Sequence, residues 1–593
     1  MTPRVLAISA VAVVVGVVAA YVSYGLLKLI GFFTNLFFFG RVGTSLVSPA
    51  GHHLGLWVIA VPVAGGLVVG LMARYGSDRI RGHGIPEAIE AILMSGSRVE
   101  PKVALLKPLS AAISIGSGGP FGAEGPIILT GGAFGSLVAQ FLHLTSAERK
   151  TLLVAGAAAG MAATFAAPLA STLLAVELLL FELKPRSLVP VALACIASTT
   201  IRRHLMGMGP LFPVPVHPAF VGYGGLLGCA FVGILAGVFS ALLTGAVYAA
   251  EDAFQRLPIH WMWWPALGGL AIGVGGWIFP QALGVGYDVI ATLLAGNAPL
   301  KIALGVLIVK SLIWSISLGS GTSGGVLAPL LMMGAAVGAI AGRVLPFEGV
   351  GFWPLVGMSA ILGGTMRVPL TSVVFAYELT HDGNVLLPLM LAVVVAHAFT
   401  VLIMRRSILT EKISRRGYHL SREYSIDPLE IIFAREIARS SVLALPADAT
   451  AEQVDASMRS SGPTGRNQQR LFPVLQADRT LVGVITRGDL RKWIELSRTA
   501  GTRPLGEMIE RRPVLTFDDE PLRLVVAKMA GKGVTRLPVV ERGTRRFVGM
   551  IALADLLQAR VRLLEAEERR ERVLGTQIRL PAAFARLEKL MRR

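Results

Sequence analysis

The sequence predicts an all-α polytopic membrane domain, built partly from broken helices, followed by a soluble α/β region. Of its 593 residues, 53% are hydrophobic and only 16% are charged, a balance that is typical of membrane proteins. Apolar runs recur up to about residue 404, and charged residues become frequent beyond it. A run of about 20 apolar residues can cross a bilayer, but Gly or Pro interrupts many of these runs, which predicts half-helices. The candidate spans are 6–27, 54–73, 151–182, 187–201, 220–249, 262–279, 302–318, 326–345 and 385–404.

The net charge of +19 lies largely in the C-terminal part of the chain. Basic residues directly follow the last apolar run, and positive charge at a span end marks the cytoplasmic side of a membrane. These basic residues are scattered and lack interleaved aromatic residues, so no nucleic-acid partner is expected. The two cysteines lie apart in apolar runs, which argues against a disulfide framework or a metal site. The residues concerned are Arg405, Arg406, Lys412, Arg415, Arg416, Cys195 and Cys229.

An internal repeat organises the apolar region. Residues 114–129 align without gaps with residues 317–332, and the matching positions are Ser, Gly and Pro. Downstream of both copies, a proline is followed at the same spacing by a glutamate: Pro168 by Glu177, and Pro369 by Glu378. Transporters built from such repeats place their site at the repeat interface near the membrane midplane. Whether the two copies are parallel or inverted stays open at this point.

Three glycine-rich segments precede a proline-initiated helix: 82–86, 122–126 and 324–329. Glycine allows a ligand to approach the backbone closely, and the first N–H groups of a helix lack intrahelical partners. The helix dipole adds a partial positive charge, so such segments bind anions without any full positive charge. The alternative is that Gly and Pro only punctuate membrane helices.

Glu124 is the carboxylate in the second of these segments. An ionisable group within the membrane is costly and therefore a functional candidate. Its natural place is the anion site, where the ionised side chain would block the pore and the protonated side chain would leave it open. The alternative role is that of a helix cap. Other charges in apolar runs are expected to pair or to cap helices: Glu177, Lys310, Arg367 and Glu378.

These segments resemble the signature motifs of the CLC family of chloride channels and proton-coupled chloride exchangers. Residues 284–287 and 357–382 add further matches, so the resemblance covers about residues 20–420. It implies homodimers with one pore per subunit, inverted repeats, and Glu124 as the gate of the pore. It also implies an anion site lined by His83, Gly84, Ile85, Gly122, Gly125, Gly325, Val326, Leu327 and Leu409. The expected location is the plasma (inner) membrane.

Three positions depart from the family pattern. His83 stands where the family usually has a serine that faces the anion; it is either a cation that attracts anions or a neutral hydrogen-bond donor. Leu409 replaces a tyrosine at the inner end of the pore. Leu178 replaces a glutamate that relays protons in exchangers. Together these departures favour a passive, voltage- or pH-gated chloride channel over an H⁺/Cl⁻ antiporter of the same fold.

Two classes outside this family remain as alternatives. A cation channel would need rings of carboxylates or carbonyls, whereas these helix starts carry one carboxylate and otherwise expose N–H groups. A membrane enzyme would need a nucleophile–base pair or a metal cluster, and the sequence has no HExxH, no GxSxG and no Cys/His cluster. We therefore expect a transport protein and not an enzyme, with no required cofactor.

The soluble region repeats a short α/β pattern that resembles a tandem pair of CBS domains. The expected organisation is a membrane domain over 1–420, CBS domains over 435–498 and 505–560, and a charged helical tail over 561–593. Each copy is expected to begin with a helix, near 450–460 and 521–531. The family's ribose contacts fall on Thr486 and Asp489 in the first copy and on Asp555 in the second. Adenine nucleotide binding and a ligand-free dimerisation role both stay open.

Overall fold

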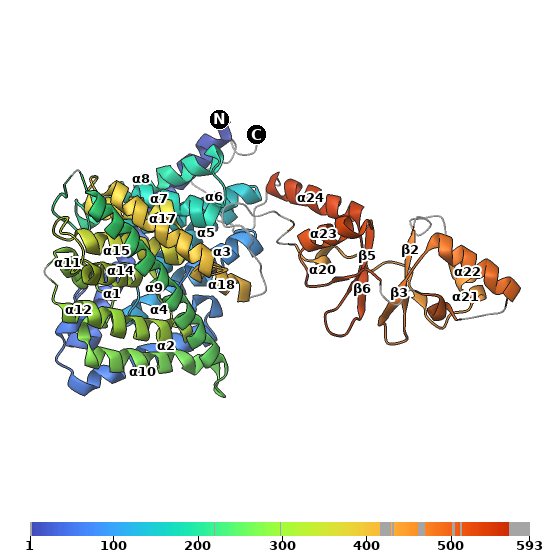
Figure 1. The fold of residues 1–593 in the computed structure, drawn as a ribbon, viewed down its shortest axis with the longest axis horizontal. Helices are drawn as coiled ribbons and strands as arrows, with labels where there is room; N and C mark the ends of the chain where they lie inside the picture. The colour runs from blue at the N-terminus through green and yellow to red at the C-terminus, as the bar shows by residue number, and fades with distance from the viewer. Residues whose placement is uncertain are drawn as a thin grey trace. The chain divides into compact units, whose positions relative to one another are not determined.

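The computed structural model describes residues 3–415 except 219 and 297, residue 429, and residues 432–568 except 461–468, 501–503 and 510–512. These residues form two compact units, with the chain dividing near residue 425. We call them the membrane unit and the C-terminal unit (Figure 1). The first part of the predicted tail, up to Glu568, forms the end of the last helix, and the rest of the tail lies outside the described residues. Arg416 also lies outside them.

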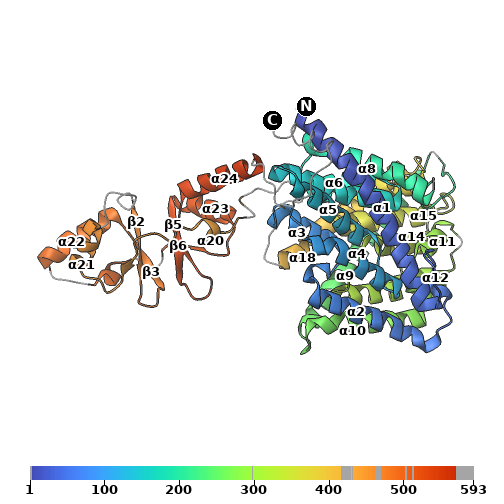
Figure 2. The ribbon, with the colours of Figure 1, turned by 180° about the vertical axis from the view of Figure 1, so that it is seen from behind.

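The membrane unit consists of helices, as its composition predicts. They are α1 (Pro3–Phe39), α2 (Ala60–Tyr75), α3 (Ile85–Met94), α4 (Pro101–Gly116), α5 (Glu124–Phe141), α6 (Ser146–Phe165), α7 (Pro168–Leu174), α8 (Pro185–Met206), α9 (Tyr223–Gln255), α10 (Trp264–Ile278), α11 (Tyr287–Leu294), α12 (Leu300–Gly305), α13 (Ser311–Gly319), α14 (Leu327–Ala341), α15 (Phe352–Met366), α16 (Pro369–Thr380), α17 (Leu386–Ile403) and α18 (Ile408–Arg415). Two π-helical segments, Ala175–Leu180 and Val306–Lys310, continue α7 and join α12 to α13. Figure 2 shows α1 running obliquely along the whole unit.

Among the described residues, five helical segments are long and apolar enough to cross a bilayer: Arg4–Phe39, Gly55–Tyr75, Tyr223–Gln255, Leu300–Gly319 and Leu386–Arg415. Three apolar segments are shorter: Pro168–Leu180, Leu327–Ala341 and Phe352–Met366. A helix of 15 residues such as α14 is about 22 Å long, less than a hydrocarbon core of about 30 Å. The predicted half-helices are therefore confirmed.

The expected single span over 151–182 is wrong. The chain breaks after α6, where Ala166 adopts the left-handed conformation (φ 59°), and Pro168 begins α7. Proline suits the first turn of a helix because its missing N–H would have no partner there. An apolar run alone does not reveal this break, because both helices are equally apolar.

The two repeat copies cap each other's helices. The Glu177 carboxylate accepts hydrogen bonds from the backbone N–H groups of Leu370 (3.2 Å) and Thr371 (2.9 Å) at the start of α16. The Glu378 carboxylate accepts from Leu169 (3.0 Å) and Ala170 (2.7 Å) at the start of α7. The predicted capping role of these glutamates is confirmed, and the reciprocity fits two copies that are related by a two-fold axis.

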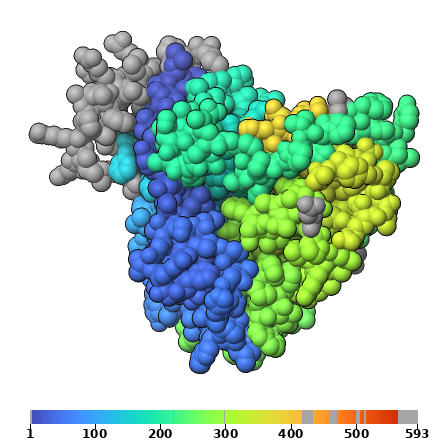
Figure 3. Space-filling model, turned by 90° about the vertical axis from the view of Figure 1, so that its left-hand side faces the viewer, coloured from blue at the N-terminus to red at the C-terminus, as the bar shows by residue number. Residues whose placement is uncertain are grey.

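Helices packed around the two repeat copies bury the starts of α5 and α14. Figure 3 shows one face of the membrane unit, on which the N-terminal segment (blue) lies beside the segment near residue 300 (green). In the sequence these segments are far apart. Residues 46–49 of the first segment and 284–288 near the second line one common cavity.

The C-terminal unit contains two similar three-stranded sheets. The first sheet has β1 (Leu445–Pro446), β2 (Leu471–Leu475) and β3 (Leu481–Thr486), with α21 (Ala451–Ser460) and α22 (Arg487–Ala500). The second sheet has β4 (Thr516–Phe517), β5 (Arg536–Val540) and β6 (Phe547–Ala552), with α23 (Leu522–Lys532) and α24 (Leu553–Glu568). The short helix α20 (Ala434–Ile437) precedes β1 in the chain and packs against β6 and α24 of the second sheet. In each sheet the first pair is parallel and the second antiparallel. The helices expected near 450–460 and 521–531 are confirmed.

Candidate functional site

The starts of α5 and α14 meet through their glycine-rich segments. The Gly122 N–H donates to the Gly325 carbonyl (3.0 Å), and the Gly325 N–H donates to the Gly122 carbonyl (2.8 Å). The segment 82–86 packs against the segment 122–126 at the same place. Their backbones touch there: a Cβ atom added at Gly84 would overlap the Gly125 carbonyl, and one added at Gly125 would overlap the His83 carbonyl. The backbones approach so closely that only glycine fits at these crossings.

Glu124 lies at this meeting point and is completely buried. Its Oε1 accepts a hydrogen bond from the Tyr287 hydroxyl (3.2 Å), and the backbone N–H of Ala328 in the first turn of α14 stabilises the carboxylate electrostatically. Its Oε2 overlaps the place where a Cβ of Gly122 would be, is 2.9 Å from that of Gly325, and accepts no hydrogen bond from the described residues. The carboxylate thus lies beside the starts of α5 and α14, where the helix dipoles favour an anion.

Three other predicted anion-site residues adjoin the glycine-rich segments and are buried, whereas Leu409 is buried in a separate helix. Val326 directly precedes α14 and Leu327 begins it, while Ile85 begins α3; all three are 0% exposed. Leu409 lies in α18 and is also buried. The carbonyl of its neighbour Ile408 accepts a hydrogen bond of 2.5 Å from the Tyr248 hydroxyl.

A cavity of about 350 Å³ adjoins His83. Arg81 faces it with its guanidinium over the rings of Trp261 (4.5 Å) and Trp264 (5.7 Å). Lys412 also lines it and pairs with Glu87 at 2.9 Å. The charged and titratable residues of the lining are Asp78, Arg81, His83, Tyr248, Glu251, Lys412 and Arg415. Two of the three lining cations are paired with carboxylates, Lys412 with Glu87 and Arg415 with Asp252 and Glu411.

Two fully buried lysines hold the loops around the site. Lys107 donates to the carbonyls of Ile80 (2.8 Å) and Gly82 (2.7 Å). Lys310 donates to the carbonyl of Gly284 (2.7 Å). A buried ammonium group needs such acceptors, and both lysines therefore fix the backbone of a glycine-rich segment.

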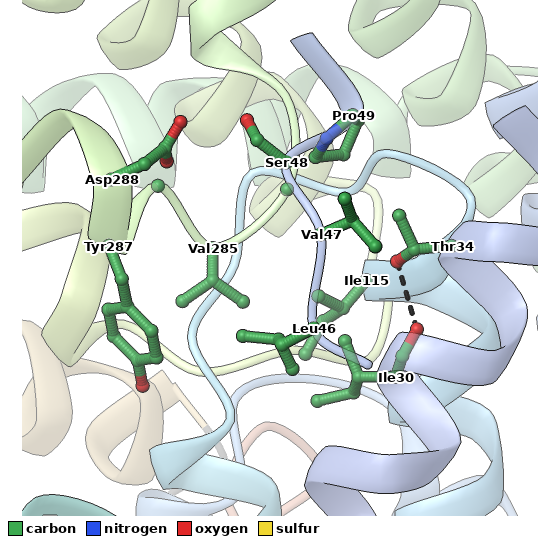
Figure 4. Close-up of a pocket in the computed structure, with 12 residues that line it drawn as sticks. Ile30, Thr34, Leu46, Val47, Ser48, Pro49, Ile115, Val285, Tyr287 and Asp288 are labelled. Carbon is green, nitrogen blue, oxygen red and sulfur yellow. Dashed lines mark hydrogen bonds between the residues drawn. The ribbon is translucent and has the colours of Figure 1, made fainter. Parts of the chain in front are cut away.

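A second cavity of about 160 Å³ lies beside the loop that carries Tyr287. Figure 4 shows its lining, which is mostly apolar and includes Val285, Leu46, Val47 and Ile115. Tyr287 therefore lies between this cavity and the Glu124 carboxylate.

Leu178 lies in the π-helical segment after α7, and 4% of it is exposed. It has no ionisable group. In this part of the chain, the neighbouring Glu177 is engaged in capping α16.

The candidate nucleotide contacts differ between the two sheets of the C-terminal unit. The Thr486 hydroxyl donates to Asp489 (2.7 Å) in an exposed position at the start of α22. Asp555 is buried and accepts hydrogen bonds from Arg439 (2.6 Å) and from the backbone N–H of Ala552 (2.8 Å). The second carboxylate is thus already occupied by partners within the protein.

Sequence reasoning gave no role to Tyr287, Lys107 or Ala328. Tyr287 stood in a recognised motif, but its contact with Glu124 joins residues far apart in the chain. Lys107 offered a usable signal, since a lysine within a helix that buries most of its other residues calls for a partner. Among the described residues, no group of three or more His, Cys, Asp or Glu side chains could hold a metal.

The fold and this buried crossing define a polytopic membrane protein with a site made of helix starts. The sequence profile of the voltage gated chloride channel family matches residues 65–401, and that of the CBS domain matches residues 434–496 and 505–562. The chain belongs to the voltage gated chloride channel (CLC) family, and two CBS domains follow the membrane unit in the sequence. The predicted family and fold class are confirmed.

The curated relatives include both kinds of CLC protein. A putative chloride channel protein ClcB-like of Ralstonia nicotianae is 32% identical over 57% of this chain and 81% of its own length. An H⁺/Cl⁻ exchange transporter ClcA of Salmonella paratyphi B is 31% identical over 65% of this chain and 84% of its own length. The chloride channel protein CLC-f of Arabidopsis thaliana is 28% identical over 82% of this chain and 70% of its own length.

Solved structures share the fold at lower identity. A slow cyanobacterial Cl⁻/H⁺ antiporter has a TM-score of 0.60 at 24% identity, covering 70% of this chain and 98% of that structure. A eukaryotic CLC transporter has a TM-score of 0.58 at 20% identity and covers 93% of this chain and 98% of that structure.

Proposed function

We propose that this protein exchanges chloride for protons across the membrane, with Glu124 as the gate of the anion pathway. The observation that carries the proposal is the fully buried Glu124 carboxylate in the space left by Gly122 and Gly325, beside the starts of α5 and α14. A chloride ion is stabilised by the same helix starts as the Glu124 carboxylate, so the two anions compete for one binding site. Protonation removes the carboxylate's charge and releases it from that place, which links anion binding to proton binding.

The relatives support exchange more than the channel that Leu178 and Leu409 favoured. The exchange transporter ClcA is named for H⁺/Cl⁻ exchange, and the cyanobacterial neighbour is described as an antiporter. In exchange, Glu124 carries the proton while chloride passes. A leucine at position 178 cannot deliver that proton from the inner side. His83 is the histidine that lines the cavity of about 350 Å³, and it directly precedes Gly84, which crosses Gly125 next to Glu124; we therefore propose its imidazole as the inner proton carrier.

Flux measurements in proteoliposomes test this function. Purified wild-type protein should move protons uphill when a chloride gradient is applied, and chloride should move uphill in a proton gradient. Glu124→Ala should keep chloride flux and lose proton movement. Brisk chloride flux in the wild type without any proton movement would establish a channel instead, and conduction of sodium without chloride would overturn the family function as a whole.

The role of His83 has its own test. His83→Ser should retain chloride flux while proton movement falls at least tenfold, because serine has no group that titrates near neutral pH. His204→Ser, at the exposed end of α8, is the matched control and should leave both fluxes unchanged. Unaltered proton coupling in His83→Ser would remove His83 from the pathway.

The assembly proposed is a homodimer in the plasma membrane with the C-terminal unit in the cytoplasm. Arg405, Arg406, Lys412 and Arg415, near the end of the last span, support the cytoplasmic side. Proteolysis of sealed vesicles of known orientation tests the sidedness, since only inside-out vesicles should lose the C-terminal unit.

For the CBS pair we propose adenine nucleotide binding at the first copy. The exposed Thr486 hydroxyl and Asp489 carboxylate can meet ribose hydroxyls, whereas Asp555 is held by Arg439. Titration calorimetry with ATP should show one site per chain, lost in Asp489→Ala and kept in Asp555→Asn. An absence of binding to the wild type would leave the pair as a dimerisation module.

A further inference from the structure

We propose that Tyr287 is a positioning residue that holds Glu124 in the anion site, and that breaking their hydrogen bond is part of opening the pathway. This inference rests on the proposed gate role of Glu124. It adds a latch outside the three glycine-rich segments 82–86, 122–126 and 324–329, carried by the first residue of α11.

The first support is the contact itself. The Tyr287 hydroxyl donates to Oε1 of the completely buried Glu124 at 3.2 Å. A hydrogen bond to an ionised carboxylate is roughly twice as strong as one to a neutral group. The bond therefore stabilises the ionised carboxylate in its place and weakens when Glu124 takes up a proton. The strength of the latch follows the protonation state of the gate.

The second support is the packing of the Tyr287 ring. Phe165 at the end of α6 packs edge-on against it, with ring centroids 6.4 Å apart, and Phe212 does the same at 6.0 Å. Phe165 in turn packs edge-on against Phe375 of α16, with centroids 4.9 Å apart. Residues from both repeat copies thus fix the direction of the hydroxyl, as expected for edge-to-face aromatic contacts.

The third support is the attachment of the loop. The Lys310 ammonium donates to the Gly284 carbonyl (2.7 Å), and the Gly284 N–H donates to the Gly118 carbonyl (3.0 Å). Gly286 has φ 84°, and a Cβ there would lie 2.6 Å from the Met332 sulfur. Lys310 therefore fixes the loop that leads to Tyr287.

The cavity of about 160 Å³ provides the space that a latch requires. It lies beside the loop of residues 284–288, and Figure 4 shows the Tyr287 ring at its edge. In the proposed opening, the ring leaves its contacts with Phe165 and Phe212 and moves towards this cavity. Tyr287 then releases Glu124 while the glycine crossings stay in place.

A double-mutant cycle tests the latch, with chloride flux measured in proteoliposomes from about pH 4, near the usual pKa of a glutamate, to about pH 7.5. Tyr287→Phe keeps the ring and removes the hydroxyl. Losing a hydrogen bond to a charged group should raise flux at neutral pH by about tenfold or more. The ratio of acid to neutral flux should shrink, because less holds the ionised gate. In the Glu124→Ala background, Tyr287→Phe should change flux by less than about twofold.

Equal effects of Tyr287→Phe in both backgrounds would show that Tyr287 acts on the fold and not on the gate, and would overturn the latch. A Glu124→Ala protein with wild-type flux, pH dependence and proton coupling would refute the gate role itself, so the two failures are distinguishable. Lys310→Met is the second variant: it should raise neutral flux only when Glu124 is present, and Lys310→Arg should restore it. Tyr377→Phe in α16, a residue that is 37% exposed, is the matched control and should leave flux unchanged.

Discussion

At the scale of single residues, the site depends on glycines, because they have no side chain to keep the two segments apart. Gly122 and Gly325 exchange backbone hydrogen bonds, and the Glu124 carboxylate fills the space in which their Cβ atoms would lie. The glycines thereby bring the carboxylate within reach of N–H groups from two helices. Their conformational freedom matters less here than the closeness of approach that they permit.

Gly325→Ala should therefore damage the site. The new Cβ would lie 2.6 Å from the Gly122 carbonyl and 2.9 Å from the Glu124 carboxylate, and the first of these is backbone that cannot move aside. We expect a loss of stability of about 1 to 3 kcal/mol, as for other overpacked positions, and at least a tenfold loss of chloride flux. Thermal unfolding in detergent and liposome flux measure the two effects.

Gly245→Ala is the matched control, since nothing lies within 4 Å of a Cβ added at this position of α9. It should leave flux unchanged and stabilise the helix slightly, because alanine has the higher helix propensity. Wild-type flux in Gly325→Ala would show that the crossing of the two segments is looser than described above.

At the scale of helices, the broken elements are stabilised by caps from the opposite repeat copy. Glu177 caps α16 and Glu378 caps α7. Within the membrane no water satisfies the free N–H groups at a helix start, so each cap replaces solvent there. The repeats consequently depend on each other for stability.

Removing either cap should lower stability without abolishing the site. Glu177→Ala and Glu378→Ala should each cost about 1 to 2 kcal/mol, the upper part of the range for N-caps, and the double variant should lose the sum because the caps act on different helices. Thermal unfolding in detergent measures this, with the half-exposed Glu100→Ala as the control. Unchanged melting of both single variants would contradict the capping role.

In the C-terminal unit, Glu520 makes stability depend on pH. Burial raises the pKa of Glu520, but hydrogen bonds from Lys528 (2.6 Å) and Thr516 (2.6 Å) outweigh it and bring the pKa below its usual value. A carboxyl group whose pKa is lower in the folded state than in the unfolded state stabilises the fold at neutral pH. That contribution is lost as the pH falls through the pKa of the folded state.

We therefore expect hydrogen exchange in β4 and α23 of the full chain to accelerate as the pH falls below about 4.5, the usual value for a glutamate, after correction for intrinsic rates. Glu520→Gln should exchange faster at neutral pH and respond less to acid. Equal acid responses of the two proteins would exclude Glu520 as the cause.

At the scale of the whole molecule, a complete site within one chain predicts independent pores. Glu124, Tyr287 and the three glycine-rich segments all belong to the same membrane unit. In the proposed homodimer, a mixed dimer with one wild-type and one Gly325→Ala subunit should carry about half the wild-type flux per dimer. Light scattering should give twice the chain mass of 62.7 kDa. A mixed dimer without flux would show that the subunits share one pathway.

The sequence predicted the class of fold, the family and the glycine-rich segments, because these depend on local signals: apolar runs, Gly–Pro spacing and two matching copies of one motif. It also predicted that Glu177 and Glu378 cap helices, but not that each caps the other copy. It did not locate the break at Ala166, since both flanking helices are apolar. Contacts between distant segments were beyond it: the Tyr287 hydroxyl on Glu124, the Lys107 and Lys310 ammonium groups on loop carbonyls, and Asp555 held by Arg439. The physical reason is that propensity and hydropathy act along a few turns of chain, whereas the partner of a buried polar group is chosen by how the helices pack.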